Sequence, residues 1–271
     1  MTGRHRRPRR LSHEGRRLVG GGLLAVFFAV VSVYTLNVAI AQVKECDEAV
    51  TLHVAAAPEM ARVLEGYQLN ETLSDRCISL ALEGRDSADG PGEAAHVWIP
   101  ETVLWSDFHA ADESAKRWEA YRASVAADPV GIPADGRTVP RPRDVRVGDP
   151  RRDTAALLWI STYGVDEDVV RAADDPEAPE LVRRTELDDS AGGFHRFDDL
   201  SAPWLSYPML TPGQMDAPVR SAVETLSEEL ASSSFRTELE DWGFTAPREN
   251  PPIYSVTVVD DVLRAWESYE R

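Results

Sequence analysis

The sequence predicts an α/β fold for residues 46–271, preceded by one apolar N-terminal segment. Strand-like alternation and helix-like periodicity follow one another along residues 46–271, and helices between successive strands imply parallel pairing. Residues 18–41 contain no charged side chain. The chain has 271 residues, of which 43% are hydrophobic and 28% are charged. These values are ordinary for a folded protein of one or two domains.

Residues 18–41 predict one transmembrane helix that anchors the chain in the cell membrane. A helix of this length spans about 36 Å, which is enough to cross a hydrocarbon core of about 30 Å. The Arg-rich residues 1–17 precede it, so the positive-inside rule places this basic tail in the cytoplasm and residues 42–271 outside. A signal peptide is the alternative, because Ala39-Ile40-Ala41 matches a small-residue cleavage site; cleavage after Ala41 would give a secreted protein. The apolar run is longer than a usual signal-peptide core, which favours the uncleaved anchor.

The charge distribution argues against a nucleic acid partner. The formal net charge is −17, but residues 1–17 carry seven Arg and only one Glu. The rest of the chain carries 45 acidic and 22 basic residues. Because so acidic a body repels phosphate groups, we expect no nucleic acid binding.

The two cysteines, Cys46 and Cys77, both lie outside the apolar segment. In an exported protein, two such cysteines most simply form a disulfide. Two buried thiols are the alternative, and a metal site built from two cysteines this far apart is disfavoured. A disulfide would close a loop of about 30 residues and stabilise the fold by roughly 3–4 kcal/mol.

The first half of the exported part predicts strand, helix, strand, loop, strand. Apolar side chains alternate over residues 50–56, which is a strand period. Pro58 stands at a first helical position, and apolar residues then recur at helical spacing as far as Tyr67. Alternation returns at residues 78–82, and residues 96–99 form a short apolar strand.

The middle of the chain is less regular. Residues 107–122 predict an amphipathic helix, and residues 124–132 a strand or crossover. Residues 133–142 are rich in Pro, Gly and Arg, which is typical of a connector. Residues 154–163 predict a short apolar helix, whereas the acidic residues 166–199 predict short helices and solvated loop.

The C-terminal part predicts two helices, a strand and a final helix. Asp216 and Pro218 start the first helix, and Ser234 can cap the second, which ends at Gly243. Residues 253–259 predict a strand. The final helix begins at residues 260–261.

Four common motifs of enzymes and nucleotide-binding proteins are absent from the sequence. The chain has no G-x-S-x-G, P-loop, G-x-G-x-x-G or H-E-x-x-H pattern. Four of its histidines, His53, His96, His109 and His195, are widely scattered and predict no metal site. We therefore expect no cofactor and no metal.

A set of segments carries a family resemblance through its order and spacing. His96–Trp105, for example, looks like the pattern D-x-W-I-P-D-S-x-x-W. The segments are Leu52–Glu59, His96–Trp105, Ser124–Ile132, Gly148–Ala156, Tyr207–Pro208, Trp242–Phe244 and Val262–Trp266. Residues 46–271 thereby resemble the extracellular solute-binding proteins of the type II periplasmic-binding fold. The likeness is closest to an actinobacterial branch that often carries a cysteine pair and a von Willebrand factor A domain; this sequence does not include that domain.

The resemblance implies two lobes with a ligand between them. Residues 46–125 plus 205–271 would form the first lobe, and residues 126–204 a reduced second lobe. Such proteins bind ligand at helix N-termini and at loops that follow strands. The candidate ligand-binding residues are Ala57, Pro58, Glu101, Thr102, Asp153, Thr154 and Tyr207.

The sequence also departs from the family pattern. Glu101-Thr102 replaces an Asp-Ser pair, and a carboxylate there opposes an anionic ligand at a helix N-terminus. The short second lobe would form a shallow cleft. Two hypotheses follow: capture of an unknown small molecule by lobe closure, or a degenerate fold that binds an envelope protein, such as one with a von Willebrand factor A domain. A third, a hydrolase, would need a convergent nucleophile and base in the cleft.

Overall fold

The structure is a computed structural model that describes residues 46, 49–110, 117–133, 140–187, 194–195, 203–247 and 256–269. The predicted tail at 1–17, the predicted anchor at 18–41 and most of the predicted connector at 133–142 lie outside those residues. Contacts divide the chain into residues 1–47 and 48–271, and every described strand and helix belongs to the second unit. Among the described residues, none of the helices has the length and apolar character needed to cross a membrane.

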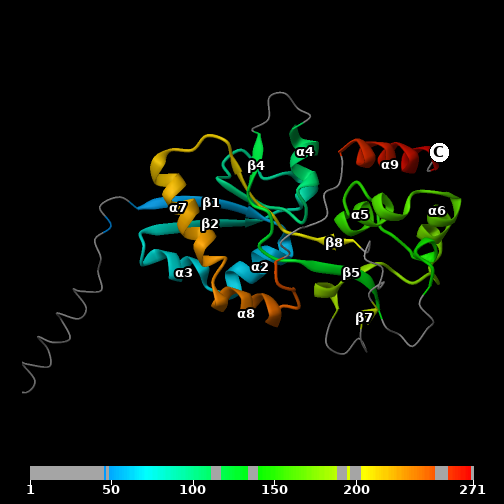
Figure 1. The fold of residues 1–271 in the computed structure, drawn as a ribbon, viewed down its shortest axis with the longest axis horizontal. Coiled ribbons are helices and arrows are strands. Elements are labelled where there is room, and N and C mark those ends of the chain that lie inside the picture. The colour runs from blue at the N-terminus through cyan, green and yellow to red at the C-terminus, as the bar shows by residue number, and fades with distance from the viewer. Residues whose placement is uncertain are drawn as a thin grey trace, which may run out of the picture. The chain divides into compact units, whose positions relative to one another are not determined.

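A five-stranded sheet of this unit has the strand order β2-β1-β3-β9-β4. Its strands β1, β2 and β4 are labelled in Figure 1. Strand β1 pairs in parallel with β2 and β3, as the helices between them imply. Strand β9 runs antiparallel to β3 and β4. The bounds are β1 Val50–Ala56, β2 Ile78–Gly84, β3 Val97–Ile99, β4 Trp118–Arg122 and β9 Met209–Pro212.

Helices before β2 and after β9 pack on this sheet, where α2 and α3 contact β2 and α7 contacts β1. Pro58 stands at the start of α2, as its restricted φ favours. Helix α8 is capped by the Ser232 hydroxyl, two residues before the predicted cap, and its last residue, Asp241, is followed after one residue by Gly243, whose φ is 84°. The bounds are α2 Pro58–Gly66, α3 Leu69–Ser74, α4 Leu104–Ala110, α7 Ala217–Glu229 and α8 Ser233–Asp241, with a 3-10 turn at Ser87–Asp89.

A second, smaller sheet is built around strand β5, which pairs antiparallel with β6, β7 and β8. Helix α5 occupies the predicted residues and is buried from Thr154 to Ile160, because it is apolar on every side. The bounds are β5 Asp128–Pro133, β6 Val182–Arg183, β7 Phe194–His195, β8 Trp204–Leu205, α5 Thr154–Tyr163, α6 Glu167–Asp174 and α9 Val256–Tyr269, with 3-10 turns at Pro142–Asp144 and Arg184–Glu186.

Two predicted elements are wrong. Within the predicted helix at 107–122, α4 ends at Ala110 and residues 118–122 form β4, which the pairing with β9 stabilises. Within the predicted strand at 253–259, residues 256–259 belong to α9. The contacts of α9 with α4, α5 and α6 outweigh the strand propensity of its β-branched residues. The acidic residues 166–199 also supply two strands of the second sheet, β6 and β7, besides the expected short helices.

The predicted disulfide is confirmed, since Cys46 and Cys77 are bonded to each other. Cys77 directly precedes β2, and its carbonyl accepts the amide of Val50 at the start of β1. The bond therefore ties the chain just before β1 to the start of its parallel neighbour.

Candidate functional site

Polar side chains from both sheets meet at one buried centre. Glu59 lies in the first turn of α2, directly after β1, and Glu101 follows β3. The carboxyl ends of parallel strands share one edge of a sheet, which is where ligands of open α/β folds commonly bind. Asp153 caps α5, and Arg183 lies on β6, so the second sheet and its helix also contribute.

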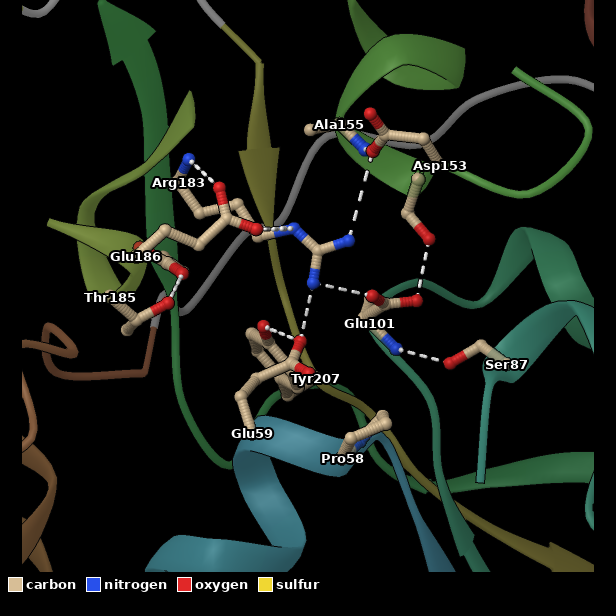
Figure 2. A network of polar contacts seen from close by, with 12 residues as sticks. Pro58, Glu59, Ser87, Glu101, Asp153, Ala155, Arg183, Thr185, Glu186 and Tyr207 are labelled. Atoms are coloured by element: carbon tan, nitrogen blue, oxygen red, sulfur yellow. Dashed lines mark hydrogen bonds and ion pairs between the residues drawn. The ribbon is translucent and has the colours of Figure 1, made fainter. Parts of the chain in front are cut away.

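Arg183 is the central member of this group, which we call the Arg183 cluster (Arg183, Glu59, Glu101, Asp153 and Glu186; Figure 2). Its Nη1 lies 2.6 Å from both Glu59 Oε1 and Glu101 Oε1. Its Nη2 lies 3.7 Å from Asp153 Oδ1, and its Nε lies 3.6 Å from Glu186 Oε1. One guanidinium thus faces four carboxylates. The side chain of Arg183 is only 13% exposed, so these are mostly desolvated ion pairs.

Tyr207 holds Glu59 from the other side. Its hydroxyl donates to Glu59 Oε1 at 2.7 Å, and its ring packs edge-on against Phe244. Its φ of 26° lies in the left-handed region, which is unfavourable for an aromatic residue. The amides of Ser206 and Tyr207 both donate to the carbonyl of Glu101, which fixes this backbone conformation.

Glu101 is held by a chain of buried donors. The Thr154 hydroxyl donates to Glu101 Oε2 at 2.5 Å and accepts the indole N–H of Trp105 at 2.9 Å. The backbone amide of Glu101 donates to the Ser87 hydroxyl at 3.3 Å. Glu101 is therefore fixed at both ends, and its carboxylate is oriented toward Arg183.

Asp128, the first residue of β5, lies in the same electrostatic environment. Its Oδ2 accepts the Thr185 hydroxyl at 2.6 Å. Its Oδ1 is buried and accepts no hydrogen bond from any residue that the structure describes. Burial raises the pKa of Asp128 to about 7, and Arg183 and Glu59 act on it in opposite directions.

The remaining pKa shifts follow from burial and charge. Burial raises the pKa of Glu101, although Arg183 opposes the rise. Burial acts to lower the pKa of Arg183, but attraction to Glu101 and its neighbours outweighs it and raises the pKa. Burial and the Glu59 charge raise the pKa of Tyr207, which therefore remains a hydrogen-bond donor. With a cation fixed among several carboxylates, the site as a whole favours positive charge.

The structure brings together four of the predicted ligand-binding residues: Glu101, Asp153, Thr154 and Tyr207. The other three are placed at turns and helix starts. Ala57 is the buried residue before α2, and Pro58 is the first residue of that helix. Thr102 is buried, and its hydroxyl accepts the amide of Leu104.

Sequence reasoning missed Arg183, Glu59, Glu186, Asp128 and Trp105. Glu59 lies within the segment that carried the resemblance, one residue beyond the chosen Pro58. Arg183 lies in an acidic stretch interpreted as solvated loop. The pattern Leu181-Val182-Arg183 is too short to predict a strand, so no signal in the sequence indicated that this arginine is buried.

Several surface cavities of the described residues lie outside the centre, and two of them differ in how close they come to it. The larger, of about 1010 Å³, lies beside β4 and the start of α7, shares no residue with the Arg183 cluster, and has His96, Arg117, Glu119 and Arg220 in its lining. The smaller, of about 240 Å³, adjoins the centre through Trp105 and has Ala88, His109 and Leu263 in its lining.

The comparisons with solved structures identify the fold. The periplasmic binding protein AfuA from Actinobacillus pleuropneumoniae, solved with exogenous fructose-6-phosphate, matches with a TM-score of 0.53 at 10% identity over 80% of this chain and 98% of that one. The substrate-binding domain of a provisionally assigned molybdenum ABC transporter from Clostridium difficile matches with a TM-score of 0.50 at 12% identity, over 74% and 100%. No family model and no curated protein matches the sequence.

The chain has the type II periplasmic-binding fold that its segments resemble. At these identities the likeness establishes the fold and not a ligand.

Proposed function

We propose that the chain is an extracytoplasmic solute-binding protein that captures a small ligand between two lobes and performs no bond chemistry. The first lobe comprises residues 46–125 and 205–271, and residues 126–204 form the second. The observation that carries this proposal is the convergence of Glu59, Glu101 and Asp153 on one buried centre. These residues come from segments that follow strands or start helices, where proteins of this fold place their ligand contacts.

The N-terminal part of the proposal concerns location. Residues 18–41 anchor the chain in the membrane, and the basic residues 1–17 stay on the cytoplasmic side. The binding lobes then face the exterior, where the Cys46–Cys77 disulfide is stable.

Native mass spectrometry of the full chain, purified without denaturation in a mild detergent, tests the capture of a ligand. We expect a mass above the denatured mass by that of one small molecule. The variant Tyr207→Phe removes the hydroxyl that holds Glu59 and should lose most of this bound species. Tyr121→Phe, on the half-exposed Tyr121 of β4, is the matched control and should retain it. Equal occupancy in both variants would place the ligand elsewhere.

A second candidate function is a protein-binding module of the cell envelope. It is favoured by one observation, namely that a side chain of the protein itself occupies the centre, with Arg183 only 13% exposed. A domain of the von Willebrand factor A type is the partner that the resemblance suggests. This function predicts an unliganded native mass, and an affinity for that partner that Tyr207→Phe leaves unchanged.

A further inference from the structure

The guanidinium of Arg183 lies at the centre formed by Glu59, Glu101 and Asp153, where the proposed function places the ligand. It reaches Glu59 and Glu101 beside the first sheet from a strand of the second sheet, and it also lies near Asp153 (Figure 2). The protein itself supplies four carboxylate partners to this guanidinium, at distances between 2.6 and 3.7 Å. The geometry is that of a cation-binding site that is already occupied.

The partners fit a planar, multidentate cation. A guanidinium presents five N–H groups in a fixed fork, and carboxylates are its preferred acceptors. In this structure Nη1 of Arg183 pairs with both Glu59 and Glu101, and Nη2 lies near Asp153. A phosphate or another oxyanion at this position would instead face Glu59 and Glu101, which are 14% and 7% exposed, with little water to screen the repulsion.

Asp128 supplies an independent indication of a ligand. It is fully buried, and its Oδ1 accepts no hydrogen bond from the part of the chain that the structure describes. Buried acceptors normally have a donor. Asp128 acts electrostatically on Tyr207 and responds to Arg183, so it belongs to the same centre. A bound ligand with a free hydrogen-bonding group could satisfy this buried oxygen.

The local structure offers Arg183 a second carboxylate partner closer to the surface. Strand β6 has only two residues, and the 3-10 turn after it brings Glu186 back toward Arg183. Glu186 is 52% exposed and already lies 3.6 Å from Arg183 Nε. An arginine displaced from Glu59 and Glu101 would therefore keep a carboxylate partner at the surface.

We propose that Glu59, Glu101 and Asp153 form a subsite for a guanidinium or alkylammonium head group, which Arg183 occupies in this structure and yields to a cationic solute. The inference rests on the proposed solute-binding function and names the class of ligand.

Chemical rescue tests the subsite on the full chain. Arg183→Ala leaves Glu59 and Glu101 without their cation, and we expect a melting temperature several degrees below that of the wild type. Methylguanidinium at 10 mM should raise the melting temperature of this variant by about 3 °C, and 10 mM urea, its neutral counterpart, should not. Arg143→Ala removes an exposed arginine paired with Asp166 and is the matched control without rescue. If Arg183→Ala does not fold, Arg183→Gln keeps more of the side chain and takes its place.

Titration calorimetry of the wild type tests the exchange. Agmatine should bind, inorganic phosphate should not, and Glu101→Gln should weaken agmatine binding at least tenfold. Glu119→Gln, on the exposed Glu119 of β4, should leave the affinity unchanged.

The outcomes separate the inference from the function on which it rests. Rescue of Arg183→Ala together with agmatine binding by the wild type supports both. Rescue no larger than in Arg143→Ala overturns the subsite. Binding of phosphate in place of agmatine overturns the inference but leaves solute capture standing. A third outcome is rescue of Arg183→Ala while the wild type binds neither probe and has an unliganded native mass. That outcome overturns both the displacement of Arg183 by a solute and the proposed function.

Discussion

At the scale of single residues, Asp128 has the most unusual environment. It is a carboxyl group with no exposure to solvent and with one oxygen that no described residue satisfies. Burial raises its pKa from 3.8 to about 7. The folded state therefore holds a proton on Asp128 between about pH 4 and pH 7, whereas the unfolded chain has already lost it.

This difference fixes the sign of a pH dependence. Because the folded state binds more protons in this range, the free energy of unfolding should fall as the pH rises from 5 to 8, by about 3 kcal/mol from Asp128 alone. The variant Asp128→Asn should lose this part of the slope. Urea unfolding at several pH values measures it, with the exposed Asp241→Asn as the control. Equal slopes in wild type and Asp128→Asn would show that Asp128 titrates normally.

Single residues also show how far the site could be predicted. Glu101, Asp153 and Thr154 could be chosen as candidates because the resemblance places ligand contacts at helix starts and after strands, where these residues stand. Arg183 could not be predicted, because its role depends on a two-residue strand pairing with β5 across about fifty positions of sequence. Three of its four carboxylate partners, Glu59, Glu101 and Asp153, come from separate segments that only the folded chain brings together.

At the scale of elements, prediction succeeded where local signals agree. Helix α5 has an Asp cap, an apolar run and a terminal Gly164 with a φ of 86°, and its predicted bounds match. Strands β1 and β2 show clear alternation and were also predicted. Strand β4 and helix α9 were misassigned because their partners, β9 for one and α4 to α6 for the other, decide their conformation.

The disulfide beside the β1–β2 pair should contribute measurably to stability. The Cys46–Cys77 disulfide closes a loop of about 30 residues beside this pair, which begins with Val50 opposite Ile78. The double variant Cys46→Ser/Cys77→Ser should lose about 3 kcal/mol of unfolding free energy. Denaturant unfolding measures the loss, and a reducing agent should lower the stability of the wild type but not of the variant. Two alkylatable thiols in native wild-type protein would contradict the bond.

At the scale of the whole molecule, the chain and the Arg183 cluster share an excess of negative charge. Outside residues 1–17 the chain carries 45 acidic against 22 basic residues, and the Arg183 cluster repeats this excess with four carboxylates around one guanidinium. An acidic protein that binds a cation also attracts that cation over a longer range, which raises the rate of association at low salt.

The N-terminal segment gives the last prediction. Residues 18–41 are long enough to cross a membrane as a helix, and the basic residues 1–17 favour the cytoplasmic side. We expect the mature protein to keep residues 1–41. It should also remain in the membrane fraction after an alkaline wash. Ala41→Leu blocks a small-residue cleavage site but preserves an anchor, so the variant should keep the same N-terminus and the same location as the wild type. A wild-type N-terminus at Gln42, together with an Ala41→Leu variant that keeps the N-terminal segment, would instead identify a cleaved signal peptide and a freely diffusing binding protein.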